Sequence, residues 1–229
     1  MADRPMLLVL RPEPGCAATM ALAQARGLAV HGQPLSQIVP VAWETPDPAS
    51  VDGLLIGSAN VFAHGGTGLD VLRAKPCYVV GKATAQAARK AGFSVAAQGE
   101  GGLQKVLDQI GLPLRLLRLA GEEHIALHAP QGVTITTRIV YRSKTLPLDP
   151  AAALMGQGQV IALLHSAATM RHFSEECERL GVDISQITLA ALGPRIVAAA
   201  GEGWQAVQIA AAPNDAALLE LAANLCNEA

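Results

Sequence analysis

Aromatic residues are scarce in this chain of 229 residues, because Phe, Trp and Tyr together make up only 3% of it. Hydrophobic residues reach 51% and are mainly Ala, Leu and Val. Small and aliphatic side chains of this kind are typical of helices that cover parallel strands. The length suits one large α/β domain or two domains of about 100 residues each.

Charge is also sparse: charged residues amount to 16%, and the formal net charge is −2. A chain without a positive excess is a poor binder of nucleic acid or of anionic membrane surfaces. We therefore expect neither partner. An anionic small molecule would have to be held by local donors rather than by bulk charge.

Cysteine motifs and long apolar runs are missing as well. The chain contains no C-x-x-C and no tight Cys/His cluster, and its four cysteines are scattered: Cys16, Cys77, Cys177 and Cys226. This pattern predicts free thiols in a reducing compartment and no metal site. The N-terminal apolar run from Met6 to Leu10 is too short for a signal peptide or a membrane span. The sequence thus predicts a soluble cytoplasmic protein.

Short apolar runs alternate with helical stretches, which predicts parallel sheets with right-handed crossovers. The stretch from Cys77 to Gly92 shows the pattern most clearly, since a strand, Tyr78 to Val80, stops at Gly81 and a helix follows directly. The first turn of that helix holds Lys82, Ala83 and Thr84. Such a helix directs unpaired backbone N–H groups at the space above the sheet, where they can bind an anion.

The remaining elements follow from the same pattern. Strands are expected at 6–10, 53–56, 94–97, 116–119, 133–141, 160–164, 189–192 and 206–209. Helices are expected at 17–26, 103–110, 125–132, after residue 168 up to 180, directly after 193, and at 216–226. The helical stretch after residue 60 is interrupted by glycines and should be short or broken. Residues 28–41 contain Pro34 and Pro40 and are expected to form a linker or an edge rather than a central strand.

Several landmarks recur at a nearly constant distance. Ser58-Ala59 recurs as Ser166-Ala167 after 108 residues, Gly81 as Gly193 after 112, and Gly27 as Gly132 after 105. This spacing far exceeds that of short solenoid repeats. We interpret it as a duplicated α/β unit.

Taken together, the motifs resemble those of the uroporphyrinogen-III synthases over nearly the whole chain. In chain order they are Arg11-Pro12, Ser58-Ala59-Asn60, Val80-Gly81-Lys82-Ala83-Thr84-Ala85, Val140-Tyr141, Ser166 and Ala191-Leu192-Gly193-Pro194. The resemblance implies two similar doubly wound parallel-sheet domains, joined by a two-stranded extended linker, with the active site in the cleft between them. It places domain one at 1–36 plus 147–229, domain two at 41–140, and the linker strands at 35–41 and 140–147.

The activity implied by the resemblance is the cyclisation of hydroxymethylbilane, a polyanionic linear tetrapyrrole. The hydroxyl of ring A is lost as water and ring D is inverted, which yields uroporphyrinogen III. No metal and no organic cofactor are expected, and the substrate could be handed over transiently by the preceding pathway enzyme.

The resemblance also suggests site residues. Tyr141 would be the general acid that protonates the leaving hydroxyl, an effect worth about 10²–10⁴-fold. Backbone and side-chain donors for the carboxylates would come from Arg11, Ser58, Ala59, Asn60, Gly81, Lys82, Ala83, Thr84, Gly121, Ser166, Ala167, Gly193, Pro194 and Arg195. The sequence departs from the family at Gly57 and Ile196, where a Thr is common, so we expect Thr84 to matter more than repeat symmetry alone suggests.

Other functions remain open on the residues alone. His165 beside Ser166 could be taken for the base of a serine nucleophile. No G-x-S-x-G motif surrounds this serine, and adjacent strand residues face opposite sides of a sheet, so we reject this hypothesis. The main alternative is a non-catalytic two-domain protein that binds or senses small anions in the same cleft. A third is an α/β enzyme for a phosphorylated small molecule, since helix N-termini suit phosphate equally well.

Overall fold

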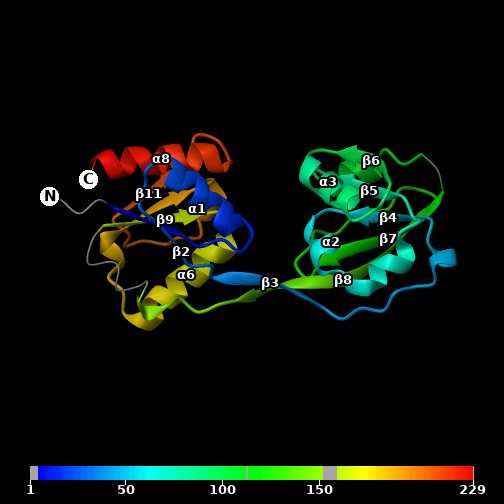
Figure 1. The fold of residues 1–229 in the computed structure, drawn as a ribbon, viewed down its shortest axis with the longest axis horizontal. Coiled ribbons are helices and arrows are strands. Elements are labelled where there is room, and N and C mark those ends of the chain that lie inside the picture. Colours follow the sequence, from blue (N-terminus) through cyan, green and yellow to red (C-terminus); the bar gives the residue numbers. More distant parts are fainter. Residues whose placement is uncertain (1–4, 112, 152–158, 229) are drawn as a thin grey trace. The chain divides into compact units, whose positions relative to one another are not determined.

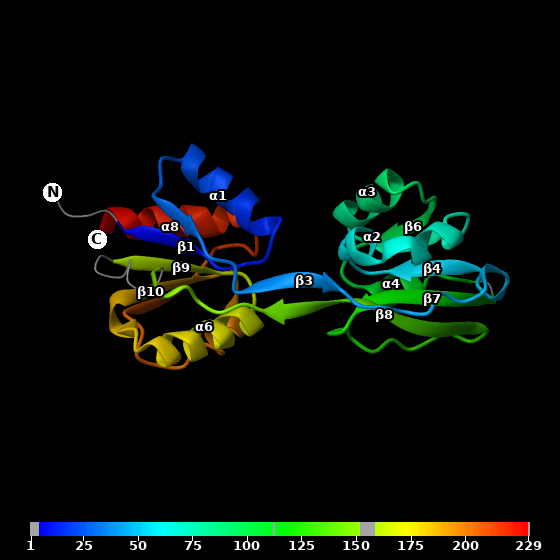
Figure 2. The ribbon, with the colours of Figure 1, turned by 60° about the horizontal axis from the view of Figure 1, so that its bottom comes forward.

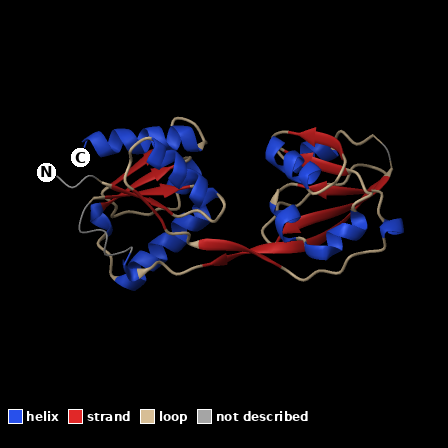
Figure 3. Ribbon diagram, viewed as in Figure 1, coloured by secondary structure: helices blue, strands red, loops and turns tan. Residues whose placement is uncertain are grey.

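The short apolar runs of the sequence form buried strands in two separate sheets. The computed structural model describes residues 5–111, 113–151 and 159–228. The chain divides into two compact units: one combines Met1–Gln37 with Lys144–Ala229, and the other is Ile38–Ser143 (Figure 1). The first unit is therefore discontinuous in sequence. Helices and strands alternate in both (Figure 3).

Unit one contains a five-stranded parallel sheet in the order β11-β10-β9-β1-β2. Its strands are β1 (Met6–Val9), β2 (Val30–Gly32), β9 (Val160–Leu164), β10 (Ile187–Ala191) and β11 (Ala206–Ile209). Its helices are α1 (Gly15–Ala25), α6 (Ala167–Leu180), α7 (Pro194–Val197) and α8 (Asp215–Glu228), with a 3-10 turn η4 (Ile184–Gln186). Because successive strand residues face opposite sides, β1 contributes to two cores. Leu7 and Val9 pack with α1 and α8, whereas Leu8 packs with α6 and α7. Figure 2 shows α1 and α8 on one side of β1 and β9, and α6 on the other.

Unit two contains a six-stranded sheet in the order β3-β8-β7-β4-β5-β6. Its strands are β3 (Ser36–Pro40), β4 (Gly53–Ile56), β5 (Cys77–Val80), β6 (Val95–Gly99), β7 (Leu114–Gly121) and β8 (Val133–Thr145). Its helices are α2 (Asn60–His64), α3 (Lys82–Lys90) and α4 (Leu103–Leu107), with 3-10 turns η1 (Pro48–Ser50) and η2 (Gly66–Leu72). One face packs against α2, η2 and α3 through Leu54 and Ile56, and the other packs against α4 through Leu55.

The strands β3 and β8 both extend across the boundary between the units. Within unit one, the Leu146 N–H donates to the Leu35 carbonyl at 2.9 Å, and within unit two the Val41 N–H donates to the Val140 carbonyl at 3.0 Å. Residue numbers rise along one segment as they fall along the other, so this pair runs antiparallel. The other pairings in the two sheets are parallel.

The sequence landmarks that recur occupy equivalent places in the two sheets. Ser58 follows β4 and Ser166 follows β9. The next two strands of the chain lie beside each of these strands in the same order, β4-β5-β6 in one sheet and β9-β10-β11 in the other. Gly27 precedes β2 and Gly132 precedes β8, at φ +71° and +82°, and these strands hold equivalent places in the orders β9-β1-β2 and β4-β7-β8. Only glycine adopts this left-handed conformation readily. This correspondence supports the interpretation of a duplicated unit.

One predicted helix does not form. Residues 122–132 are a loop rather than a helix beginning at Ile125. The backbone N–H and carbonyl of His128 are satisfied by the side-chain amide of Gln104, each at 2.9 Å, instead of by a helical turn. Ile125 is 84% exposed, and Leu127 is the residue of the loop that packs against the core cluster around Leu107, so the segment buries little apolar surface. Such tertiary hydrogen bonds override a weak local preference. The predicted helix at 103–110 is also shorter and ends at Leu107.

Candidate functional site

The carboxyl ends of the central strands of unit two bring several predicted site residues together. β4, β5 and β7 run parallel, so their carboxyl ends lie at the same edge of the sheet. Ser58 follows β4, Gly81 follows β5, and Gly121 ends β7. In open α/β sheets, ligands bind beyond this edge.

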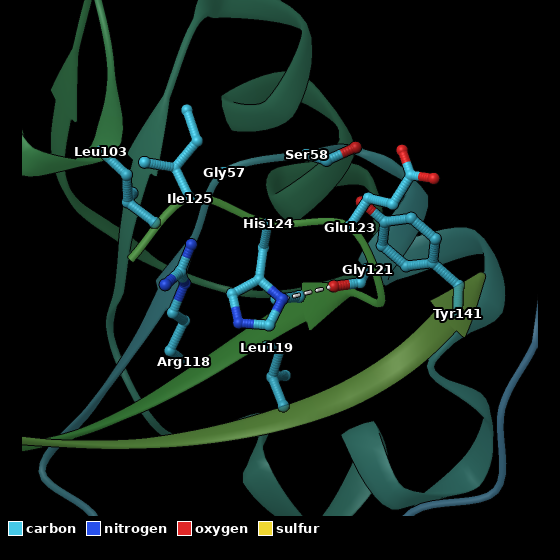
Figure 4. Close-up of a pocket in the computed structure, with 11 residues that line it drawn as sticks. Gly57, Ser58, Leu103, Arg118, Leu119, Gly121, Glu123, His124, Ile125 and Tyr141 are labelled. Carbon is cyan, nitrogen blue, oxygen red and sulfur yellow. Dashed lines mark hydrogen bonds between the residues drawn. The ribbon is translucent and has the colours of Figure 1, made fainter. Parts of the chain in front are cut away.

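A cavity of about 220 Å³ opens at this edge (Figure 4). Eleven residues line it: Gly57, Ser58, Leu103, Arg118, Leu119, Ala120, Gly121, Glu123, His124, Ile125 and Tyr141. Three of them, Ser58, Gly121 and Tyr141, are among the predicted site residues. They come from two different strands and the start of a helical turn, so only the folded sheet places them around one space.

Tyr141 is positioned by its packing against Gly121. A bulge after Ala120 shifts the register between β7 and β8, so that Tyr141 lies opposite Gly121. A Cβ on Gly121 would lie 2.5 Å from the Tyr141 Cε2 atom and 3.0 Å from the phenol oxygen. The ring therefore lies directly on the glycine backbone. Bulges commonly redirect a side chain beside a functional site, and here the phenol reaches the cavity.

At the Ser58 corner both acceptors are occupied, whereas the hydroxyl hydrogen of Ser58 is free to donate. Its Oγ accepts from the Asn60 N–H at 3.2 Å, and its carbonyl accepts from the Val61 N–H at 3.3 Å. Since a hydroxyl that accepts can still donate its own hydrogen, Ser58 keeps a donor for a ligand carboxylate. Ala59 and Asn60 form the start of the short helix α2.

The Gly81 corner has the predicted form. Gly81 has φ +79°, and α3 follows without a side-chain cap. The N–H groups of its first turn, Lys82, Ala83 and Thr84, lack helical acceptors. Lys82 and Ala83 are exposed, whereas Thr84 is only 5% exposed. The Thr84 side chain thus packs inward, so a ligand would meet the backbone of this turn first.

In unit one, Arg11 is held by an acidic partner that the sequence did not indicate. Its Nη1 lies 2.9 Å from Asp215 Oδ2, at the start of α8. The same carboxylate binds His165 Nε2 at 2.9 Å and accepts from the Thr19 hydroxyl at 3.3 Å. Burial, and secondarily the charge of Arg11, lower the pKa of His165, against the opposing effect of Asp215. His165 is therefore part of a partly buried polar network, not a base for Ser166.

The other predicted residues of unit one lie at two corners. Ser166 caps α6, and its Oγ accepts from the Thr169 N–H at 3.1 Å; Ala167 follows in the first turn. Gly193 has an extended backbone at φ 179° and precedes α7, which has only four residues. Pro194 and Arg195 are exposed, and Ile196 is buried in the core. The Gly193 corner therefore offers a weaker helix N-terminus than the Gly81 corner.

Sequence reasoning missed several lining residues. Arg118, Glu123 and His124 were not among the candidates, although they line the cavity. The His124 Nδ1 lies 2.9 Å from the Gly121 carbonyl, which fixes the imidazole beside the residue on which Tyr141 packs. The one available signal was Arg118 itself, a charged residue inside the apolar strand sequence LRLLRLAG. No group of three or more His, Cys, Asp or Glu side chains in the described ranges is arranged to hold a metal ion.

Comparisons with known proteins show the family and the fold of this chain. The family model for uroporphyrinogen-III synthase HemD matches residues 17–220. The crystal structure of the uroporphyrinogen-III synthetase from Helicobacter pylori 26695 is 16% identical, with a TM-score of 0.64 over 97% of this chain and 100% of that one. A mutant uroporphyrinogen III synthase from the extremely thermophilic bacterium Thermus thermophilus is 16% identical, with a TM-score of 0.52 over 98% and 100%.

No protein with a curated description matches the chain. Within the part of the chain that the structure describes, no helix has the length and hydropathy needed to cross a bilayer. The family model covers most of the chain, and the solved structures share its mixed α/β fold with parallel sheets. The chain belongs to the uroporphyrinogen-III synthase family, the cyclising lyases of tetrapyrrole biosynthesis.

Proposed function

We propose that this chain converts hydroxymethylbilane to uroporphyrinogen III, with Tyr141 as the general acid. The observation that carries the proposal is the position of Tyr141, whose phenol lies on Gly121 at the wall of a cavity shared with Ser58. The reaction breaks the C–O bond of the ring A hydroxymethyl group. The leaving oxygen takes the phenol proton and departs as water.

The second part of the reaction needs positioning more than acid–base chemistry. The ring A methylene bonds to the ring D carbon that already carries the bridge from ring C. That bridge bond then breaks and re-forms at the other α-carbon of ring D, which inverts the ring, and the proton lost from this carbon restores the phenol. The net change is the loss of one water. Holding a flexible chain in the closing geometry can lower the barrier by several kcal/mol. The carboxylates of the substrate provide the natural handles for this.

We assign the substrate contacts to both units. In unit two they would come from Ser58 and the first turns of α2 and α3, where unpaired N–H groups favour carboxylates. In unit one they would come from the Ser166 and Gly193 corners. Arg195 and Lys82 are exposed and can add charge. Arg11 already pairs with Asp215, so its contribution would be shared with that carboxylate.

The domain arrangement belongs to the same proposal. Residues 1–36 plus 147–229 would act as one domain and 41–140 as the other, with 35–41 and 140–147 as linker strands. The backbone bonds between Leu35 and Leu146 and between Val41 and Val140 support this assignment. We also propose a cytoplasmic location, supported by three buried thiols, Cys16, Cys77 and Cys177, whose pKa values burial raises to about 11, 12 and 12. Transient hand-over from the preceding enzyme would limit spontaneous closure of the substrate.

The decisive experiment supplies the purified protein with enzymatically generated hydroxymethylbilane. After oxidation, the uroporphyrin isomers are resolved by chromatography. We expect isomer III in excess. Isomer I alone, the product of spontaneous closure, would refute the proposed activity. Tight binding of the substrate with isomer I alone would instead favour a binding or sensing role.

A further inference from the structure

Arg118 is a charged residue in the interior of a sheet. Its backbone on β7 is paired with Leu55 of β4 on one side and with Thr137 of β8 on the other. Only 7% of the residue is exposed. Burial lowers the pKa of its guanidinium, but arginine starts so high that it stays charged at neutral pH. The sheet therefore contains a buried positive charge.

This charge has no acidic partner within the described part of the chain. The Nε atom of Arg118 is buried without a hydrogen bond, and the ion pairs among the described residues do not include this guanidinium. Arg115 on the same strand shows the usual arrangement, because it binds Asp52 at 2.7 Å. A buried cation without a partner is destabilising. An anion that enters the cavity would relieve that penalty.

The cavity gives such an anion access to Arg118. Arg118 lines it, and Figure 4 shows the guanidinium pointing toward Leu103 and Ile125 at the cavity wall. Glu123 is the acidic residue of the lining, and its carboxylate points away from Arg118 in the same view. The volume of about 220 Å³ is below the roughly 300–1,000 Å³ of pockets that hold whole drug-sized ligands. It suits one substituted ring or side chain of a larger ligand.

We propose that Arg118 binds a carboxylate side chain of the linear tetrapyrrole, a subsite that rests on the proposed function. The anion would be an acetate or propionate group whose oxygens accept hydrogen bonds from the guanidinium. Planar, bidentate recognition of carboxylates is the particular strength of arginine. Tyr141 lines the same cavity, so the bound carboxylate would occupy the space that the phenol faces.

The test measures KM, kcat and product isomer for Arg118→Gln and Arg118→Lys. A hydrogen bond to a charged group contributes enough for a change of about 10- to 100-fold. We expect Arg118→Gln to raise KM by that factor, with kcat within about threefold of wild type and isomer III still in excess. Arg118→Lys keeps the charge without the planar fork, so its KM should lie between the two.

Arg115→Gln is the matched control, since Arg115 is on the same strand, exposed and already paired with Asp52. Its KM should equal that of the wild type. An unchanged KM for both Arg118 variants would overturn the subsite. The same assay measures the product isomer of the wild type. If the wild type yields isomer I alone, the proposed function is refuted, which is a different outcome from the failure of the subsite.

Thermal unfolding separates binding from a structural role. Replacing a buried, unpaired cation by an apolar residue of similar length should not destabilise the fold. We therefore expect Arg118→Met to keep or raise the Tm while losing the extra stability that the product gives the wild type. A lower Tm with wild-type product stabilisation would overturn the proposal. Should the Met and Gln variants fail to fold, an unchanged KM for Arg118→Lys would overturn it.

Discussion

Substituting Gly121 by alanine tests whether the position of the Tyr141 ring controls turnover. The backbone of Gly121 is not in the left-handed region, so alanine introduces no backbone strain there. The new Cβ would lie 2.5 Å from Cε2 and 2.7 Å from Cζ of Tyr141, whereas ordinary contact begins at 3.4 Å. The ring must therefore retreat by about 0.9 Å.

A displacement of this size has a predictable consequence. Misplacing a catalytic group by about 1 Å can cost about 10²-fold in rate, and overpacking of this kind costs about 1–3 kcal/mol of stability. We expect Gly121→Ala to remain folded with kcat reduced about 10- to 100-fold. The assay is the initial rate of isomer III formation, together with unfolding in denaturant.

Two further variants isolate the cause. Gly111→Ala is the control, because nothing lies within 4 Å of a Cβ at Gly111 and its φ is not positive. It should leave both rate and stability unchanged. If Gly121→Ala acts through the phenol, then combining it with Tyr141→Phe should add little to the loss from Tyr141→Phe alone. Full turnover of Gly121→Ala would refute the reasoning.

Three other predictions concern single side chains. Tyr141→Phe should lower kcat at least tenfold with an unchanged far-UV spectrum, and an unchanged rate would remove Tyr141 from the mechanism. Glu176→Gln should cost about 1–3 kcal/mol at pH 6, since the carboxylate binds Arg179 at 2.7 Å and the Leu148 N–H at 2.6 Å. The hydrogen bond from Arg179 is the main reason that the pKa of Glu176 is lowered from 4.5 to about 2. The stabilisation by the Glu176 carboxylate is therefore present above about pH 4.5 and lost as the pH falls toward 2. Denaturant unfolding measures the difference in stability between Glu176→Gln and the wild type. If this difference does not shrink as the pH falls over this range, the prediction is wrong. Arg11→Gln should lower the free energy of unfolding by about 1 kcal/mol, because the ion pair with Asp215 is lost. An unchanged midpoint of denaturant unfolding with a raised KM would show that Arg11 binds the substrate instead.

Much of the fold could be predicted because its signals are local. The runs GLLI, CYVV and VIALL are fully or largely buried strands, and short apolar runs that alternate with helical stretches have few alternatives to a parallel sheet. The glycine after β5 indicated its corner, because a positive φ is a property of a single residue. The helix expected at Ile125 was wrong, since the side chain of Gln104 binds that segment from another element.

The candidate site divides in the same way. The family resemblance was enough to suggest Ser58, Gly121 and Tyr141, which the structure then places around one cavity. The sequence could not show that Arg11 is paired with Asp215, 204 residues away, because ion pairs between distant segments leave no local pattern. Nor could it show that Arg118 is buried without a partner.

The sequence by itself determined the alternation of strands and helices, the glycine corners and the family motifs, because each depends on residues close together in the chain. Only the tertiary structure decided which polar groups share a space, which are already neutralised and which are left unpaired. Those properties depend on the pairing of β4, β7 and β8. Strand pairing sets Leu55 beside Arg118, for example, although β5, β6 and their helices separate the two residues along the chain.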